Sequence, residues 1–374
     1  MSAPPLEDEN LLSEILLRLP PEPSSLPRAS AVCKRWRQLV SDPRFTCRFR
    51  LHHRRNPPIL GFIDNIFGRI LFEPTLQAPN RVVPERFSLQ QDHNDVLLPL
   101  GCRHDLVLML DPKRKQVLVW EPVTGNQDRI ALPPRFDSQD TNGAVLRAAG
   151  DVHFQVVLVV SASNDELHTQ VLACVYSSKT RIWGNLISSL LPPTNVSPND
   201  DIVSEMPAVL VGGSLYWTVM CGLPRIIEFD LERQSLGVIR LPMDMFKYEV
   251  DYELTLMRAE GGGLGFLLVS RGDLSAQLWK RKIDCDGVDS WELGRTIELD
   301  KLLSLNSLEE RRTLTIVGFA ECNNAVFLWA SMRLFIVHLE SFQFNNVLQT
   351  NSLLCCQPFE GVYTAGNCTP LHCG

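Results

Sequence analysis

From residue 59 onward the sequence repeats one pattern at a nearly constant interval. Short runs rich in Val, Ile, Leu, Phe and Trp alternate with polar turns, as in DLVLML (105–110), QVLVW (116–120) and RIIEFD (225–230). Leu-Pro or Val-Pro pairs follow these runs at positions 83, 132, 191 and 241, and weaker equivalents begin at 299 and 348, a mean spacing of 53 residues. Because no long helical stretch separates the runs, the pattern predicts an all-β fold.

The repeat also predicts how many units the fold has. Ahead of each of these points a strand ends in a bulky residue and a polar turn follows; the six residues are Phe72, Trp120, Tyr176, Phe229, Trp279 and Val337. Six such hairpins occupy residues 59–350, and the segment CCQPFEGVYTAG (355–366) is left over. Propellers close their ring by pairing a terminal strand with the first blade. The sequence therefore predicts a six-bladed β-propeller over residues 59–370, with seven blades as the alternative.

The first 50 residues follow a different period. Apolar residues at 11, 12, 15, 16 and 19 form a stripe on one face of a helix that Pro20–Pro21 ends. A second helix is expected after Pro23, and a third carries apolar residues at 32, 33, 36, 39 and 40 before it closes near Asp42–Pro43. We therefore predict a small three-helix domain over residues 1–50, whose wide apolar stripe indicates that a partner covers part of it.

Charge separates the two regions. Residues 28–55 carry nine Lys and Arg against one acid, whereas the chain from residue 57 onward has 26 Lys and Arg against 37 Asp and Glu. This break predicts a linker at residues 51–58. The basic stretch shows no finger spacing, helix-turn-helix pattern or interleaved aromatics, so we expect no nucleic-acid partner.

Two groups of motifs resemble a known family. LLSEILLRLPP (11–21) followed by ASAVCKRWRQLVSDPRF (29–45) resembles the F-box of plant F-box proteins, and VWEPVTG (119–125), YSSKTRIW (176–183) and EFDLERQS (228–235) resemble their propeller-like associated domains. The resemblance implies a multidomain protein, an all-α F-box followed by an all-β propeller. It implies a non-catalytic substrate receptor of an SCF-type ubiquitin ligase, whose F-box docks a Skp-type adaptor and through it the cullin and RING subunits. The adaptor contacts carried over by motif are Leu11, Leu12, Ile15, Leu16, Leu19, Pro20, Val32, Cys33, Trp36 and Leu39.

The sequence shows no pattern typical of a catalytic, metal or cofactor site. The cysteines form no Cys-x-x-Cys pair, the histidines form no His-x-x-x-His pair, and GGGLG (261–265) lacks the Lys-Ser/Thr of a phosphate-binding loop. Two alternatives stay open: a propeller hydrolase, and an F-box protein that binds the adaptor outside a ligase. Apolar runs fall far short of the roughly 18 residues that a membrane helix needs. We expect an intracellular protein of the cytoplasm or nucleus, with no membrane partner.

The protein substrate is expected on one face of the propeller. Loops from the outer strand of one blade to the inner strand of the next emerge on the same face and here include residues 134–143, 194–206, 242–253 and 300–312. Their charges are −1, −3, −3 and 0. They predict an acidic rim for a basic substrate segment, the alternative being a face that is merely solvated. The rim consists of Asp137, Asp140, Asp200, Asp201, Glu205, Asp244, Glu249, Asp251 and Glu253.

Overall fold

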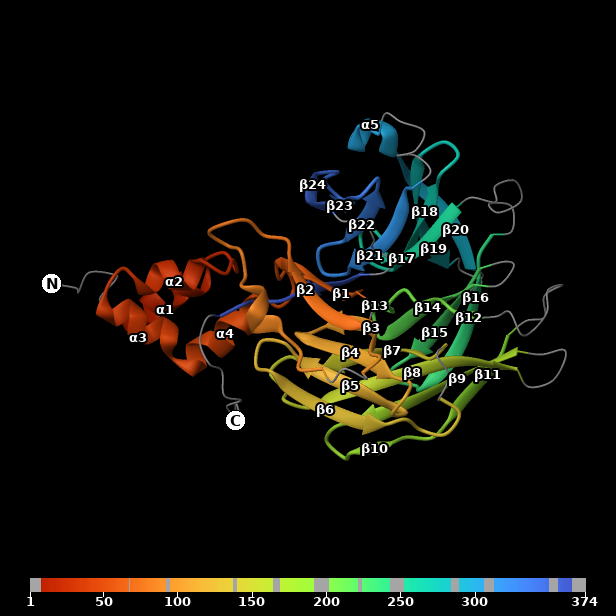
Figure 1. Cartoon of the computed structure of the whole chain (residues 1–374), viewed down its shortest axis with the longest axis horizontal. Helices are drawn as coiled ribbons and strands as arrows, with labels where there is room; N and C mark the ends of the chain where they lie inside the picture. Colours follow the sequence, from red (N-terminus) through yellow and green to blue (C-terminus); the bar gives the residue numbers. More distant parts are fainter. Residues whose placement is uncertain are drawn as a thin grey trace.

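A helical domain stands beside a ring of β-sheets in the computed structural model of the chain (Figure 1). The ring carries most of the residues, and the helices lie against one of its two faces. The structure describes residues 8–66, 68–91, 95–136, 140–163, 169–191, 202–220, 224–242, 252–283, 289–305, 313–349 and 356–364.

Four helices form the N-terminal domain: α1 (Glu9–Leu17), α2 (Ser25–Ser30), α3 (Lys34–Ser41) and α4 (Pro43–His53). Asp8 caps α1 by accepting a hydrogen bond from the Asn10 N–H at 2.9 Å. Asp42 caps α4 in the same way, and Pro43 occupies its first position, where a missing N–H costs nothing.

The fourth helix corrects the predicted domain layout. The three-helix prediction ended near Asp42–Pro43 and placed a linker at 51–58, but residues 51–53 are the last turn of α4. Val32 and Cys33 precede α3 rather than belonging to it. Phe45 and Phe49 of α4 are buried in the helical core, so this helix is part of the domain and not a connection.

Six sheets make up the ring, which confirms the six-bladed propeller. Blade 1 contains β1 (Ile59–Ile66), β2 (Arg69–Pro74) and β25 (Cys356–Glu360). Blade 2 contains β3 (Leu98–Arg103), β4 (Leu106–Asp111), β5 (Gln116–Glu121) and β6 (Asn126–Ala131). Blade 3 contains β7 (Asn142–Arg147), β8 (Phe154–Ser163), β9 (Thr169–Ser177), β10 (Ile182–Trp183) and β11 (Ile187–Leu190).

The other three blades repeat the antiparallel order. Blade 4 contains β12 (Ile202–Val203), β13 (Val209–Val211), β14 (Ser214–Met220), β15 (Arg225–Asp230) and β16 (Ser235–Arg240). Blade 5 contains β17 (Tyr252–Arg258), β18 (Leu264–Ser270), β19 (Ser275–Ile283) and β20 (Asp289–Glu298), and the short helix α5 (Leu299–Leu303) follows it. Blade 6 contains β21 (Thr315–Ala320), β22 (Ala325–Ala330), β23 (Arg333–His338) and β24 (Phe344–Gln349).

The left-over strand closes the ring, as the sequence predicted. β25 pairs antiparallel with β1, from Ile59 opposite Glu360 to Asp64 opposite Cys356. It also lies beside β21 of blade 6 and β3 of blade 2, which are the inner strands of the two neighbouring blades. One sheet therefore joins both ends of the propeller, the arrangement that holds such rings shut.

Blade 1 departs from the repeat. The hairpin predicted after Phe72 does not form; the chain leaves β2 at Pro74 and reaches the short 3-10 helix η2 (Pro84–Phe87) through a loop. Prolines at 74, 79 and 84 remove three backbone donors from this stretch, which disfavours a further paired strand. Phe87 instead fills the space beside Phe72, with ring centroids 4.3 Å apart.

The apolar core of the propeller lies between the blades. One cluster, for example, joins Leu108 and Val119 of blade 2 to Val156 and Leu158 of blade 3. Strand direction gives the ring two faces. The β3–β4 turn of blade 2 and the β21–β22 turn of blade 6 lie on the face toward α4, which we call the F-box face. We call the opposite face of the ring the distal face.

Candidate functional site

Part of the expected adaptor-binding set forms the core of the helical domain. Leu12 and Leu16 are fully buried, and they hold α1 against the other helices. Leu19, Trp36 and Leu39 are partly buried and pack against the same core. Substituting these residues would therefore disturb the domain itself as well as any surface that it presents.

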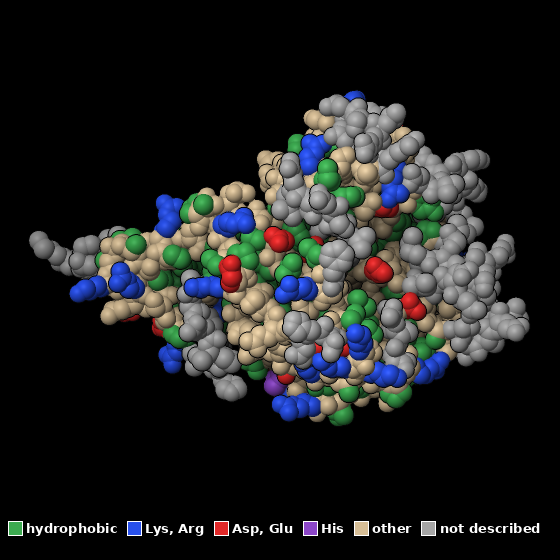
Figure 2. All heavy atoms as spheres, in the orientation of Figure 1, with side chains coloured by type: hydrophobic (Ala, Val, Ile, Leu, Met, Phe, Trp, Pro, Cys, Tyr) green, Lys and Arg blue, Asp and Glu red, His purple; other side chains and the backbone are tan. Residues whose placement is uncertain are grey.

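The remaining members are exposed: Leu11, Ile15, Pro20, Val32 and Cys33. Leu11 and Ile15 keep 42% and 38% of their surface exposed and lie one turn apart on α1, so they share a face of that helix. Val32, between α2 and α3, is 62% exposed. Exposed aliphatic side chains on so small a domain are typical of a protein-binding surface. Figure 2 shows Lys and Arg predominating over Asp and Glu on this domain.

The fourth helix, α4, was not predicted from the sequence, and it holds α1 in position. The Arg48 guanidinium of α4 donates to the Glu14 carboxylate at 2.9 Å and to the Ser13 hydroxyl at 3.2 Å. At the end of α4, the His53 Nε2 lies 2.9 Å from the Leu17 carbonyl oxygen. The Asp42–Pro43 pair, a helix cap followed by a proline at the first position, was the sequence signal for this helix.

Hydrogen bonds fasten the helical domain to blades 1 and 6. The Asn80 side chain, in the loop after β2, donates to the Glu22 carboxylate at 2.9 Å and accepts from the Ser24 N–H at 3.2 Å. From the turn between β21 and β22, Asn323 donates to the Pro57 carbonyl at 2.8 Å. The domain is therefore held by the propeller at several points of its edge.

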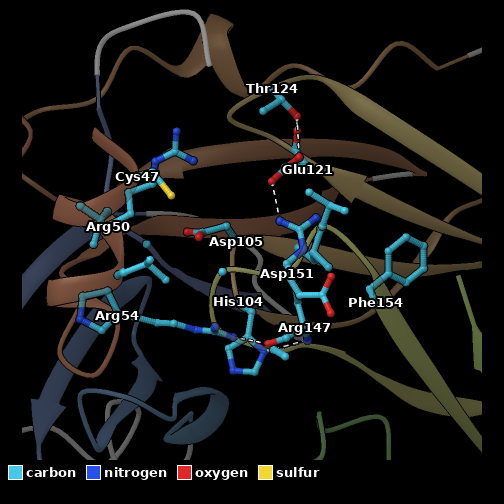
Figure 3. A pocket seen from close by; sticks show the side chains of 18 of the residues that line it. Cys47, Arg50, Arg54, His104, Asp105, Glu121, Thr124, Arg147, Asp151 and Phe154 are labelled. Atoms are coloured by element: carbon cyan, nitrogen blue, oxygen red, sulfur yellow. Dashed lines mark hydrogen bonds and ion pairs between the residues drawn. The ribbon is translucent and has the colours of Figure 1, made fainter. Parts of the chain in front are cut away.

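A cavity of about 350 Å³ lies at this junction (Figure 3). Its walls come from α4, from the turns of blades 2 and 3, and from the segment after β25. The Arg54 guanidinium donates to the Arg147 carbonyl, and the Arg147 guanidinium donates to the Glu121 carboxylate at 2.7 Å. Thr124 donates to the other Glu121 oxygen at 2.8 Å. A chain of hydrogen bonds thus runs from Arg54, at the end of α4, to Arg147 and Glu121 of the propeller.

Two neighbouring residues of the β3–β4 turn titrate abnormally in this cavity. Burial, with the nearby arginines, lowers the pKa of His104 to about 3, so this ring is neutral at pH 7 and its Nδ1 accepts the Arg147 N–H at 3.1 Å. Burial raises the pKa of Asp105 to about 6, although Arg50 and Arg147 oppose that rise. In Figure 3 the Asp105 carboxylate points toward Arg50 on α4. The junction therefore contains a carboxylate whose charge is unfavourable there.

Charged side chains narrow the propeller axis near the F-box face. The Arg103 guanidinium pairs with the Glu321 carboxylate and donates to the Ala208 carbonyl at 2.8 Å, while Arg258 approaches Glu321 at 3.8 Å. The cavity beside them holds about 20 Å³, which is room for about one water molecule. A sugar or peptide does not fit at this point of the axis.

Most of the expected acidic rim lies outside the described residues, namely Asp137, Asp200, Asp201, Asp244, Glu249 and Asp251. Of the described members, Asp140 and Glu205 are exposed. Asp140 lies in the connection between blades 2 and 3, as expected, whereas Glu205 lies between β12 and β13, inside the sheet of blade 4. The rim as a whole stays a prediction.

Glu253 corrects the expected rim. It lies inside β17 rather than in a loop, and its carboxylate pairs with Arg271. The same carboxylate accepts from the Thr315 hydroxyl at 3.0 Å and from the Ile316 N–H of β21. Glu253 therefore joins blade 5 to blade 6 through contacts within the protein, and it does not lie in the loop where the rim was expected.

Within the described ranges, no group of three or more His, Cys, Asp or Glu side chains could hold a metal ion. Among the described cysteines, Cys33, Cys102, Cys174 and Cys322 form no disulfide bond. No helix among the described residues is long and apolar enough to cross a membrane.

Curated relatives share the domain order. The chain is similar to the F-box/kelch-repeat protein At3g61590 of Arabidopsis thaliana, at 25% identity over 49% of this chain and 46% of that protein, so the match spans about half the relative's length. It is also similar to the F-box/kelch-repeat protein At3g23880 of the same plant, at 22% identity over 82% of this chain and 80% of that protein. Among solved structures, the nidogen/laminin complex matches with a TM-score of 0.40 at 10% identity, over 79% of this chain and 96% of that one, a likeness too low to bear on function.

Family models match both regions. An F-box domain matches residues 8–48, which include α1, α2 and α3 and the first half of α4. The model described as "F-box protein AT5G49610-like, beta-propeller" matches residues 100–360, more than half of the chain. The chain therefore belongs to the AT5G49610-like family of F-box proteins that carry a β-propeller.

Proposed function

We propose that this protein is the substrate receptor of an SCF-type ubiquitin ligase. The F-box docks a Skp-type adaptor, which connects it to the cullin and RING subunits, and the propeller holds the protein to be ubiquitinated. One observation carries the proposal: an F-box with exposed aliphatic side chains at Leu11, Ile15 and Val32 is mounted on one face of a propeller. The distal face is left available for a second protein.

We infer that this subunit acts by bringing two proteins close together and catalyses no reaction itself. A receptor that binds adaptor and substrate together raises the effective concentration of a substrate lysine near the ubiquitin carrier. Fastening the F-box to the propeller at Asn80, Asn323 and Arg54 limits the orientations of the two bound proteins. A better-defined geometry gives a higher effective concentration than a flexible linker does.

The substrate side rests on the acidic rim expected on the distal face. Asp140, exposed in the connection between blades 2 and 3, supports a surface for a basic segment of the substrate, in the cytoplasm or nucleus where the ligase would act. A propeller hydrolase is the weaker candidate, because the axis near the F-box face is filled by Arg103, Glu321 and Arg258. An F-box protein that binds the adaptor outside a ligase remains the second candidate.

Adaptor binding tests the proposal. The double variant Leu11→Ala/Ile15→Ala removes two exposed side chains and should leave the core intact. Exposed anchors that become buried in a complex cost about 2 kcal/mol each when truncated. We therefore expect affinity for a purified Skp-type adaptor to fall at least a hundredfold by calorimetry, since about 1.4 kcal/mol is tenfold.

A matched control comes from the far side of the protein. Leu186 and Leu190 of blade 3 are 45% and 60% exposed, so Leu186→Ala/Leu190→Ala removes similar side chains outside the F-box. This control should bind the adaptor like the unmodified protein. Equal adaptor affinities for both double variants, or no binding by the unmodified protein, would refute the proposed function.

A further inference from the structure

The apolar core of the F-box contains a residue from the propeller. Its members on the helices are Leu12, Leu16, Leu17, Leu26, Ala29, Val40, Phe45 and Phe49. The ninth member is Val362, which is 4% exposed and lies just beyond β25. Figure 1 shows the corresponding blue trace leaving the propeller and passing beside the helices. A domain of this size gains a substantial part of its burial from one additional aliphatic side chain.

The segment that carries Val362, Gly361–Thr364, is held on both sides of that residue. The Gly361 N–H donates to the Pro58 carbonyl at 3.2 Å. The Tyr363 hydroxyl accepts from Arg86 at 2.7 Å, and its ring lies 5.9 Å from that of Phe87. We call residues 361–364 the closing segment, because they continue directly from the strand that closes the ring.

Gly361 lies against Asp105 of blade 2. A Cβ at this position would lie 2.6 Å from the Asp105 Oδ1, closer than side chains approach one another. A larger residue therefore requires either the Asp105 carboxylate or the closing segment to shift. A shift of the closing segment would move Val362, the next residue, with it.

Closure of the ring determines where the closing segment lies. Glu360, the last residue of β25, pairs with Ile59, and its carboxylate accepts from the backbone N–H groups of Cys322 and Asn323 at 3.0 and 2.8 Å. These contacts exist once β25 has inserted between β1, β3 and β21. Val362 can therefore reach the F-box core in this position when blade 1 is complete.

We propose that the propeller completes the F-box in cis, so that adaptor binding depends on closure of the propeller ring. The exposed Leu11 and Ile15 are carried by α1, and α1 is held by Leu12 and Leu16 in the core that Val362 completes. Without Val362 the adaptor must order these helices at the expense of its binding free energy. The inference rests on the proposed function, and it predicts that receptors with an open propeller bind the adaptor weakly.

Two substitutions test the coupling, each with a matched control. Val362→Ala removes two methyl groups from the F-box core, and Val219→Ala removes the same atoms from a fully buried position in blade 4. Gly361→Ala meets Asp105, whereas a Cβ at Gly213 would meet no atom within 4 Å. The readouts are the Kd for a purified Skp-type adaptor and hydrogen exchange of α1 in the free protein.

We expect Val362→Ala to raise the Kd about tenfold, equivalent to about 1.4 kcal/mol, and to speed exchange in α1. Gly361→Ala should act in the same direction although it lies outside the F-box core. Val219→Ala should lower the melting temperature and leave the Kd unchanged, and Gly213→Ala should change neither.

Unchanged exchange in α1 together with an unchanged Kd for both Val362→Ala and Gly361→Ala would overturn the coupling and leave the proposed function standing. An equal rise in Kd for Val219→Ala would overturn it as well, because general destabilisation would then explain the effect. If the unmodified protein does not bind the adaptor, the proposed function fails, and exchange in α1 still reports whether Val362 completes the F-box.

Discussion

The F-box and the propeller obtain their stability in different ways. Each propeller blade is covered on both sides by neighbouring blades, and the clusters between them are large; the cluster shared by blades 4, 5 and 6 alone includes Phe266, Leu278 and Phe335. The F-box has one small core, takes Val362 from the propeller and leaves Leu11 and Ile15 exposed. This propeller cluster is therefore built from propeller residues, whereas the F-box core includes a residue from outside its own helices.

Producing the two regions as separate fragments should cause the largest loss of stability among these predictions. A fragment of residues 1–55 loses Val362 and the contacts of Asn80, so we expect no cooperative thermal transition by circular dichroism. A fragment starting at residue 56 retains all six blades and should melt cooperatively as a β-rich protein. Addition of a Skp-type adaptor should restore helical structure to the short fragment.

A cooperative melt of the short fragment without the adaptor would show that the F-box is self-sufficient. The difference between the two regions would then be one of size alone. Failure of the long fragment to fold would show the reverse dependence, with the propeller relying on α4.

Removing one partner of an ion pair inside the propeller should cause the next largest loss of stability. Glu253→Ala leaves the Arg271 guanidinium, which is largely buried, without its carboxylate and deprives the Ile316 N–H of an acceptor. Losing one partner of such a pair costs about 3 kcal/mol. Urea unfolding should show this loss, whereas the exposed Glu205→Ala should change the free energy of unfolding by less than about 0.5 kcal/mol. Equal changes in the free energy of unfolding for the two variants would mean that the blades are held together by apolar packing alone.

Sequence reasoning found the elements whose signal is local and periodic. The six blades follow from hydrophobic runs repeated at a constant spacing, and the closing strand follows from the unpaired segment that the repeat leaves over. The hairpin predicted after Trp279 forms further on, because β19 continues to Ile283 before the chain turns. Blade 1 was mispredicted after Phe72, since prolines rather than strand-forming residues follow that position.

The contacts that define the junction could not be predicted in this way. Val362 looks like any strand residue, and its place in the F-box core depends on how the closed ring lies against α4. In the same way, Glu253 was read as a loop acid, because its partners Arg271 and Ile316 lie in another turn and another blade. The sequence also did not distinguish the exposed apolar residues of α1 from the buried ones, because a five-residue apolar stripe on a short helix includes residues of both kinds.

Substitutions at the junction should cause the smallest loss of stability among these predictions. The change in the free energy of unfolding should also depend on pH. The pKa of Asp105 is raised from 3.8 to about 6, so the folded state binds more protons than the unfolded state between these values. The contribution of Asp105 to stability therefore falls as pH rises from about 4 to about 6. His104 behaves oppositely: its pKa is lowered from 6.5 to about 3, and its contribution rises with pH over an overlapping range.

Two substitutions separate these contributions. Asp105→Asn should raise the free energy of unfolding at pH 7 by up to about 3 kcal/mol, because each pKa unit corresponds to about 1.4 kcal/mol. The gain should shrink as pH falls toward 4, where Asp105 of the unmodified protein is protonated as well. Asparagine also tolerates the positive φ of 64° at this position. His104→Asn should instead change little at pH 7 and reduce the loss of stability on acidification below pH 6.5.

The measurement is urea unfolding at several pH values, with Asp151→Asn as the control at the open edge of the same cavity. The pKa of Asp151 is lowered, chiefly by the hydrogen bond from the His153 N–H, so its replacement should not stabilise the protein at pH 7. If Asp105→Asn and Asp151→Asn change the free energy of unfolding equally, the Asp105 carboxylate is solvated and the F-box does not exclude water from it. If they differ as expected, the junction between the two regions is a closed interface that costs the propeller some of its own stability.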